Sequence, residues 1–180
     1  MQATVEAIKA RSDGSPGGRK TLRRPYDGQV GAFPCCSINL GKQTVTYPHT
    51  DNCNLSHSWC SITPVGNFRH EDGGHLVLWD FGLFIDFPAG ATILIPSALV
   101  VHSNTALKSE EETRYSLVQY AAGGLFRWVE SGFMTQKDRQ SSLPQGLDQE
   151  VQDRRWSKAI DKFTHISEIE ELPHLYVCKG

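Results

Sequence analysis

The sequence contains no apolar run that approaches the roughly 18 residues needed to cross a bilayer. It also lacks a dominant charge, because 18 Lys and Arg residues face 20 Asp and Glu residues and the formal net charge is −2. The N-terminal segment MQATVEAIKARSDG has no apolar core of a secretory signal. We therefore expect an intracellular protein without a membrane partner. The near-neutral charge gives no argument for a nucleic-acid partner and none against a local basic patch.

The sequence also lacks a disulfide framework. Its cysteines are odd in number and have no regular spacing: Cys35, Cys36, Cys53, Cys60 and Cys178. In a reducing compartment such cysteines are expected to be free thiols.

At 180 residues the chain has the length of one domain with a single core. Residues 1–28 predict a flexible, basic lead-in, because RSDGSPGGRKTLRRPYDG is rich in Gly, Ser, Pro and Arg and poor in aliphatic residues. Residues 29–133 predict a β-rich core, and residues 134–180 predict a helical C-terminal extension.

Short β-rich segments separated by turn residues predict about eight strands, which is typical of a barrel or sandwich such as a jelly roll. The segments are CCSINLGKQTVTY, SWCSITPVG, HLVLWDFGLFIDFP, GATILIPSALVVHS and residues 114–121. The third is expected to turn near residues 80–82, and Pro96 is expected to split the fourth. The segments LFRWVESGFM and LDQEVQDRRWSKAIDKF predict helices. The predicted fold class is mainly β with C-terminal helices.

A candidate metal site is formed by three polar residues in this β-rich region. His49 and Asp51 in TYPHTD project from the same face of an extended segment, because they are two residues apart. His102 follows the apolar run ILIPSALVV, which puts it at a strand end. Two imidazoles and one carboxylate hold Fe(II) on one face and leave positions open for co-substrate and oxygen. A histidine that only caps a core strand is the alternative for His102.

His70 and Asp72 form a second H-x-D pair, but its spacing fits less well. Only 29 residues separate Asp72 from His102, whereas 50 separate Asp51 from His102. A double-stranded β-helix normally places four strands there, and the longer interval has room for four or five strands with turns. We therefore prefer His49 and Asp51.

Arg114 predicts a co-substrate pocket beside the candidate metal site. It lies twelve residues after His102, enough for a turn and the start of an adjacent strand. A buried arginine needs an anion and offers two parallel N–H donors to a carboxylate. Ser116 lies on the same face and can add a hydroxyl. The alternative is a surface ion pair between Arg114 and residues 110–112.

With these residues the chain resembles the Fe(II)/2-oxoglutarate dioxygenases, and most of all the TET and J-binding-protein branch. Fungal, transposon-associated members have segments similar to GGHLVLWD, FPAGATILIPSALVVHSN and RYSLVQYAAGGLFRWVESGF, and the resemblance covers roughly residues 45–133. It implies a double-stranded β-helix (jelly-roll, cupin-like) barrel. It also implies that the catalytic residues His49, Asp51 and His102 bind Fe(II), that Arg114 and Ser116 bind 2-oxoglutarate, and that ascorbate serves as reductant.

The same resemblance implies a substrate. Enzymes of this branch oxidise the methyl group of pyrimidines in DNA or RNA, and a protein acting there would be nuclear. Asn54 matches a base-contacting asparagine, and Tyr120 matches a tyrosine on which the extruded base stacks. Ala122 stands where TET enzymes have a base-contacting histidine.

Three alternatives stay open at this point. The first is a prolyl-hydroxylase-like oxygenase that acts on a protein or small molecule, in which case a cytoplasmic location is expected. The second is a degenerate, non-catalytic β-helix that serves as a binding module. The third is a cupin-type metalloprotein, in which Arg114 would have no evident task.

Overall fold

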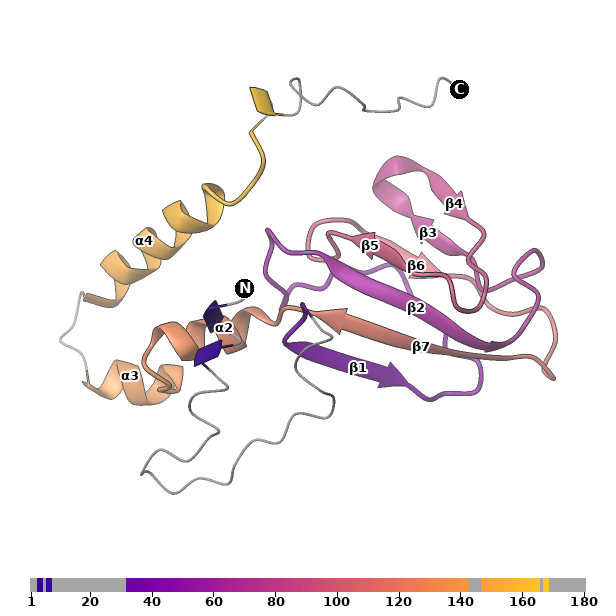
Figure 1. The fold of residues 1–180 in the computed structure, drawn as a ribbon, viewed down its shortest axis with the longest axis horizontal. Coiled ribbons are helices and arrows are strands. Elements are labelled where there is room, and N and C mark those ends of the chain that lie inside the picture. Colours follow the sequence, from indigo (N-terminus) through magenta and orange to yellow (C-terminus); the bar gives the residue numbers. More distant parts are fainter. Residues whose placement is uncertain (1–2, 5, 8–31, 143–146, 166, 169–180) are drawn as a thin grey trace. The chain divides into compact units, whose positions relative to one another are not determined.

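The computed structural model describes residues 3–4, 6–7, 32–142, 147–165 and 167–168 (Figure 1). The chain divides into two compact units, Met1–Arg139 and Gln140–Gly180, each described here by itself. Of the predicted lead-in, only residues 3–4 and 6–7 are described, and they are helical; the rest lies outside the described residues. The strands are β1 (Cys35–Asn39), β2 (Cys60–Asn67), β3 (Leu76–Leu78), β4 (Leu83–Ile85), β5 (Ile93–Ile95), β6 (His102–Asn104) and β7 (Thr113–Tyr120). The helices are the 3-10 helix η1 (Trp79–Phe81) and the α-helices α2 (Gly123–Glu130), α3 (Gln136–Ser142) and α4 (Leu147–Ile160).

The larger sheet has four strands in the order β1-β7-β2-β5, and all its pairs are antiparallel. Strand β7 lies between β1 and β2 and alternates as its sequence predicts (Figure 1). Arg114 and Ser116 are buried on one face, while Tyr115 on the other face is only half-buried. In the register of the sheet, Ser116 is the partner of Asn39 in β1 and of Pro64 in β2.

The smaller sheet has three strands in the order β4-β3-β6, again antiparallel. Strands β3 and β4 are joined by η1, and the turn ends at Gly82, whose φ of 61° lies in the left-handed region that suits glycine. The predicted strand pair with a turn near residues 80–82 is confirmed.

A compact apolar cluster joins the two sheets. Leu76 and Leu78 come from the smaller sheet and Ile95 from the larger one, and they pack with Phe87 and Val100. Each of these buried side chains contributes about 1.5–3 kcal/mol relative to full exposure. The cluster therefore holds the two sheets together and fixes the loops between them.

The described residues form seven strands in two sheets, mainly β as predicted, and their pairing does not close one barrel. The predicted β-rich segment CCSINLGKQTVTY forms no strand after Gly41, and residues 42–49 make isolated bridges instead, from Gln43 to Arg114 and from His49 to His102. Two features explain this. Thr46 directs its N–H to the side chain of Asn104 instead of a backbone carbonyl, and Pro48 has no N–H to give.

Helix α2 begins at Gly123, shortly after β7, buries Phe126 and ends within the segment LFRWVESGFM that was predicted to be helical. Helix α4 lies where the sequence predicts it. Within the described residues, no helix is long and apolar enough to cross a membrane. The four described cysteines, Cys35, Cys36, Cys53 and Cys60, are free thiols as expected, and Cys178 lies outside the described residues.

Candidate metal and co-substrate site

The backbone brings His49 beside His102. Each residue accepts a hydrogen bond from the other's N–H, at 3.1 Å and 3.0 Å, so the two form an antiparallel bridge. Asp51 is fixed in turn by its own N–H, which donates to the Ser97 carbonyl at 2.8 Å. His102 is the first residue of β6, not the last residue of the preceding run, because residues 96–100 form a turn after Pro96.

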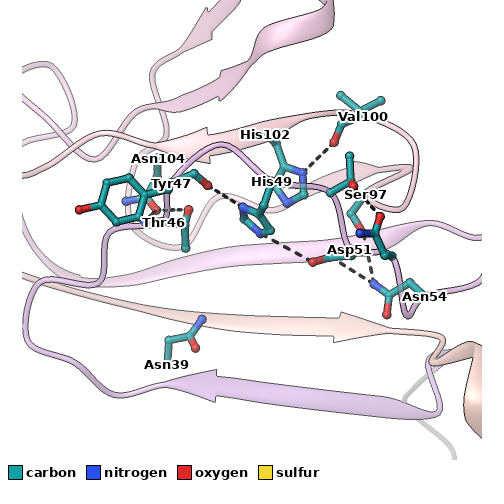
Figure 2. Close-up of polar contacts among 12 residues, drawn as sticks. Asn39, Thr46, Tyr47, His49, Asp51, Asn54, Ser97, Val100, His102 and Asn104 are labelled. Atoms are coloured by element: carbon teal, nitrogen blue, oxygen red, sulfur yellow. Dashed lines mark hydrogen bonds and ion pairs between the residues drawn. The ribbon is translucent and has the colours of Figure 1, made fainter.

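The side chains of His49, Asp51 and His102 converge, as Figure 2 shows. One potential ligand atom from each lies within 4.8 Å of the other two, close enough to share one cation. His49 Nε2 is 3.7 Å from Asp51 Oδ1, and the two imidazole centroids are 4.4 Å apart. Among the described residues, His49, Asp51 and His102 are the His, Cys, Asp or Glu side chains that come this close together in a group of three.

Backbone carbonyls orient both imidazoles. His49 Nδ1 lies 2.7 Å from the Tyr47 carbonyl oxygen, and His102 Nδ1 lies 2.9 Å from the Val100 carbonyl oxygen (Figure 2). A carbonyl only accepts hydrogen bonds, so each Nδ1 must carry the proton. The neutral ring then has its lone pair on Nε2, which is the atom that a metal needs.

The three candidate ligands differ in exposure. His102 is buried, with 5% of its surface exposed, whereas the His49 and Asp51 side chains are 40% and 30% exposed. A cation held there would be enclosed on the His102 side and reachable from the other side. Cys60 is close to Ser97 but does not belong to this group of three side chains, and burial raises the pKa of its thiol to about 11.

Arg114 is 4% exposed, and burial lowers the pKa of its guanidinium. Its Nε is buried without a hydrogen-bond partner. The alternative of a surface ion pair with residues 110–112 is wrong, because Arg114 is buried and forms no ion pair within the described residues. Glu112 instead accepts hydrogen bonds from the backbone N–H groups of Arg69 and Ser109.

Ser116 lies two residues from Arg114 on the same buried face of β7. Its Oγ accepts a hydrogen bond from Asn39 Nδ2 at 2.8 Å, so its own O–H remains able to donate. Asn39 belongs to β1, and the sequence analysis did not identify it. No local signal could have done so, because the contact depends on the register of β1 against β7.

One cavity of about 600 Å³ joins all these groups. Its volume is within the usual range of small-molecule sites. All seven predicted site residues line it: His49, Asp51, Asn54, His102, Arg114, Ser116 and Tyr120.

The two predicted substrate-contacting residues both have partners inside the protein. Asn54 Nδ2 lies 3.2 Å from Asp51 Oδ2, and the Tyr120 hydroxyl lies 3.1 Å from Ser37 Oγ. Ala122 forms an isolated backbone bridge with Asn54. The predicted base contacts of Asn54 and Tyr120 remain predictions.

Asn104 is a supporting residue that the sequence analysis missed. It is buried, and its Oδ1 accepts hydrogen bonds from the N–H and hydroxyl of Thr46 (Figure 2). Its Nδ2 donates to the Thr44 carbonyl. It thereby anchors the segment that leads into His49. Its position two residues after His102, on the same face of a strand, was the available signal.

The second H-x-D pair, His70 and Asp72, makes contacts outside this site. Asp72 forms ion pairs with Arg69 at 3.3 Å and with Lys108 at 3.4 Å, and His70 lies 3.4 Å from Glu71. The spacing argument that favoured His49 and Asp51 agrees with the geometry, since β2, β3, β4 and β5 lie between Asp51 and His102.

Chains similar to this protein are found among solved structures. No family model and no curated protein matches the chain. A structure of NgTET1 in complex with 5mC DNA is similar, at 26% sequence identity and a TM-score of 0.38. The match covers 43% of this chain and 27% of that chain, so it spans about a quarter of NgTET1 as crystallised.

Proposed function

We propose that the protein is an Fe(II)- and 2-oxoglutarate-dependent dioxygenase. The observation that carries the proposal is one cavity that holds a His-Asp-His cluster together with a buried arginine lacking an anionic partner among the described residues. A metal site alone would leave Arg114 unexplained. An anion site alone would leave the paired orientation of His49 and His102 unexplained.

The donor set fits ferrous iron. Two imidazoles with protonated Nδ1 and free Nε2, together with one carboxylate, form the facial set typical of non-heme Fe(II) oxygenases. With neutral imidazoles, Fe(II) and Asp51 leave a net charge of +1. Such a centre attracts an anionic chelator.

The second half of the cavity fits a dicarboxylate. The buried Arg114 Nε needs an acceptor, and a guanidinium binds a carboxylate through two parallel hydrogen bonds. The Ser116 hydroxyl, already accepting from Asn39, can donate to the same carboxylate. We infer that these two residues bind the distal carboxylate of 2-oxoglutarate, and that its other end faces the iron.

The protein's part in the reaction is binding, orientation and exclusion of water. His49, Asp51 and His102 would hold the iron, while Arg114 and Ser116 orient the co-substrate against it. When bound, iron, 2-oxoglutarate and O₂ supply the oxidation, in which one oxygen atom enters a substrate C–H bond and the other enters succinate as CO₂ leaves. Ascorbate is the expected reductant that keeps the iron ferrous. The buried position of Arg114 keeps its contact with the carboxylate away from water.

The fold that we propose for this chemistry is a double-stranded β-helix of the jelly-roll, cupin-like kind. Two antiparallel sheets enclose a shared apolar cluster, and the site lies where His49 bridges to β6. The four-strand interval between Asp51 and His102 supports the same fold.

For the substrate we propose a 5-methylpyrimidine in DNA or RNA. Tyr120 lines the cavity at the end of β7 and offers an aromatic face to an extruded base. Ala122 favours the second candidate, hydroxylation of a protein or small molecule, because it supplies no imidazole to contact a base. A non-catalytic module is not favoured by the intact ligand set.

The experiment that separates the substrates measures succinate released from 2-oxoglutarate with Fe(II) and ascorbate. Three arms contain 5-methylcytosine DNA, the same DNA unmethylated, and no nucleic acid. We expect methylated DNA alone to raise succinate release, and we expect its product to gain the mass of one oxygen atom. Equal release in all three arms would exclude the methylated base and favour the second candidate.

A further inference from the structure

The two carboxylate oxygens of Asp51 have different surroundings. Oδ1 lies 3.7 Å from His49 Nε2, on the side of the other candidate metal ligands. Oδ2 accepts a hydrogen bond from Asn54 Nδ2 at 3.2 Å (Figure 2). One oxygen therefore faces the other ligands, and the second is held by an amide of the protein.

Both N–H groups of the Asn54 amide have acceptors. The second acceptor is the Oγ of Ser97, at 3.3 Å, and Ser97 is only 1% exposed. The Ser97 carbonyl also accepts the N–H of Asp51. Ser97 thus anchors Asp51 through its backbone and Asn54 through its side chain, and the amide cannot turn away without losing both bonds.

The backbone around Asn54 is fixed as firmly. Its N–H donates to the Asp51 carbonyl at 2.9 Å, and the neighbouring Leu55 N–H donates to the Ala121 carbonyl at 2.9 Å. On the other side, the Gly123 N–H donates to the Cys53 carbonyl at 2.8 Å. The position of Asn54 is therefore set by the fold and does not depend on a substrate.

We propose that Asn54 is a positioning residue that makes Asp51 a one-oxygen ligand, a role that rests on the proposed iron site. With Oδ2 bound to the amide, only Oδ1 is directed at the metal. A carboxylate that binds through both oxygens would occupy one of the positions needed for co-substrate or O₂. Partners of this kind, behind the ligands themselves, typically change metal affinity by about 10–100-fold. A substrate that contacts Asn54 would meet its carbonyl oxygen, because both N–H groups are engaged.

The test is the affinity of the full chain for Co(II) alone, measured by calorimetric titration. Asn54→Ala removes the amide, and Asn54→Leu removes its donors while keeping a similar volume. We expect each variant to weaken Co(II) binding about 10-fold. Asn52→Ala is the matched control, because Asn52 lines the same cavity but its side chain contacts Thr50 and not Asp51. It should bind as the wild-type does.

A second measurement separates positioning from general damage to the fold. Because Asn54 acts through Asp51, adding Asn54→Ala to Asp51→Ala should not weaken Co(II) binding further. Two outcomes overturn the inference. One is wild-type Co(II) affinity in the Asn54 variants, and the other is that Asn54→Ala weakens Co(II) binding as much in the Asp51→Ala background as in the wild type. If the folded wild-type protein itself binds no Co(II), the proposed metal site fails, and that result is distinct from both. Thermal unfolding of the metal-free variants identifies any variant that does not fold. If one of the two Asn54 variants fails this test, the Co(II) affinity of the other one tests the inference.

Discussion

Arg114 carries a buried positive charge that no carboxylate neutralises within the described residues. Although burial lowers its pKa, a guanidinium remains protonated in proteins, so the charge persists. The ring of Phe68 lies 6.0 Å from its Cζ and offers only a weak cation–π contact. Burying an uncompensated charge is costly, and a bound anion would relieve that cost. This is the physical reason for the predicted affinity for a dicarboxylate.

Substitution of Arg114 should therefore act on the co-substrate. Arg114→Lys keeps the charge but loses the two parallel donors, and Arg114→Ala loses both. Hydrogen bonds to charged groups contribute about 1.5–3 kcal/mol, so we expect Arg114→Ala to raise the KM for 2-oxoglutarate by about 10–100-fold. The lysine variant should fall between alanine and wild type. The measurement is succinate release as a function of 2-oxoglutarate concentration.

Arg69→Ala is the control for this experiment, since Arg69 is an exposed arginine that pairs with Asp72 outside the cavity. It should leave the KM unchanged. A KM for 2-oxoglutarate that is the same in wild type and Arg114→Ala would remove Arg114 from its assigned role.

The residues that could be predicted from the sequence are those whose chemistry is informative without a partner. His49 and Asp51 are recognisable from their spacing, and Arg114 from its place in an apolar strand. Asn39 could not be predicted, because an asparagine at the end of a strand has many uses. Only the pairing of β1 with β7 brings it to Ser116.

At the scale of elements, the contact between β2 and β7 depends on Gly66. Its φ is 132°, and a Cβ built there would lie 2.2 Å from the Thr113 carbonyl oxygen. Gly66 is also the register partner of Arg114. A glycine is therefore required where β2 passes the strand that carries the co-substrate residues.

Gly66→Ala should destabilise the protein strongly. The residue would have to adopt a φ that costs about 1–3 kcal/mol, and the added methyl group would also displace the Thr113 carbonyl. Gly90→Ala is the matched control, because Gly90 has a φ of 86° but nothing within 4 Å of its Cβ position. Thermal unfolding should show a distinctly larger decrease in Tm for Gly66→Ala than for Gly90→Ala. Equal losses would mean that backbone conformation alone, and not the close approach of β7, makes Gly66 necessary.

Individual elements were easier to predict than their arrangement. The β3–β4 turn and the alternation in β7 follow from local residues, namely Gly82 and the spacing of Arg114 and Ser116. The order β1-β7-β2-β5 joins strands that are far apart in sequence, and no local pattern encodes it. The segment around Thr46 looks like a strand but is held by the Asn104 side chain instead. Contacts of this kind become visible only in three dimensions.

At the scale of the whole unit Met1–Arg139, the site draws on both sheets. His102 belongs to the smaller sheet, and Arg114 and Ser116 belong to the larger one. The apolar cluster around Leu76 and Ile95 holds these sheets together. The backbone bridge between His49 and His102 adds a link at the His-Asp-His group. The proposed metal ligands and the proposed co-substrate residues are thus brought into one cavity by the fold of the unit as a whole.

The central claim is that this cavity couples the His-Asp-His cluster to 2-oxoglutarate turnover. Its most direct test is succinate release by the wild-type protein, with Fe(II) supplied or removed by a chelator, beside His49→Ala, Asp51→Ala and His102→Ala. We predict Fe(II)-dependent succinate release by the wild type and background release by each of the three folded variants. Wild-type turnover in all three variants, or turnover that persists without Fe(II), would contradict the account.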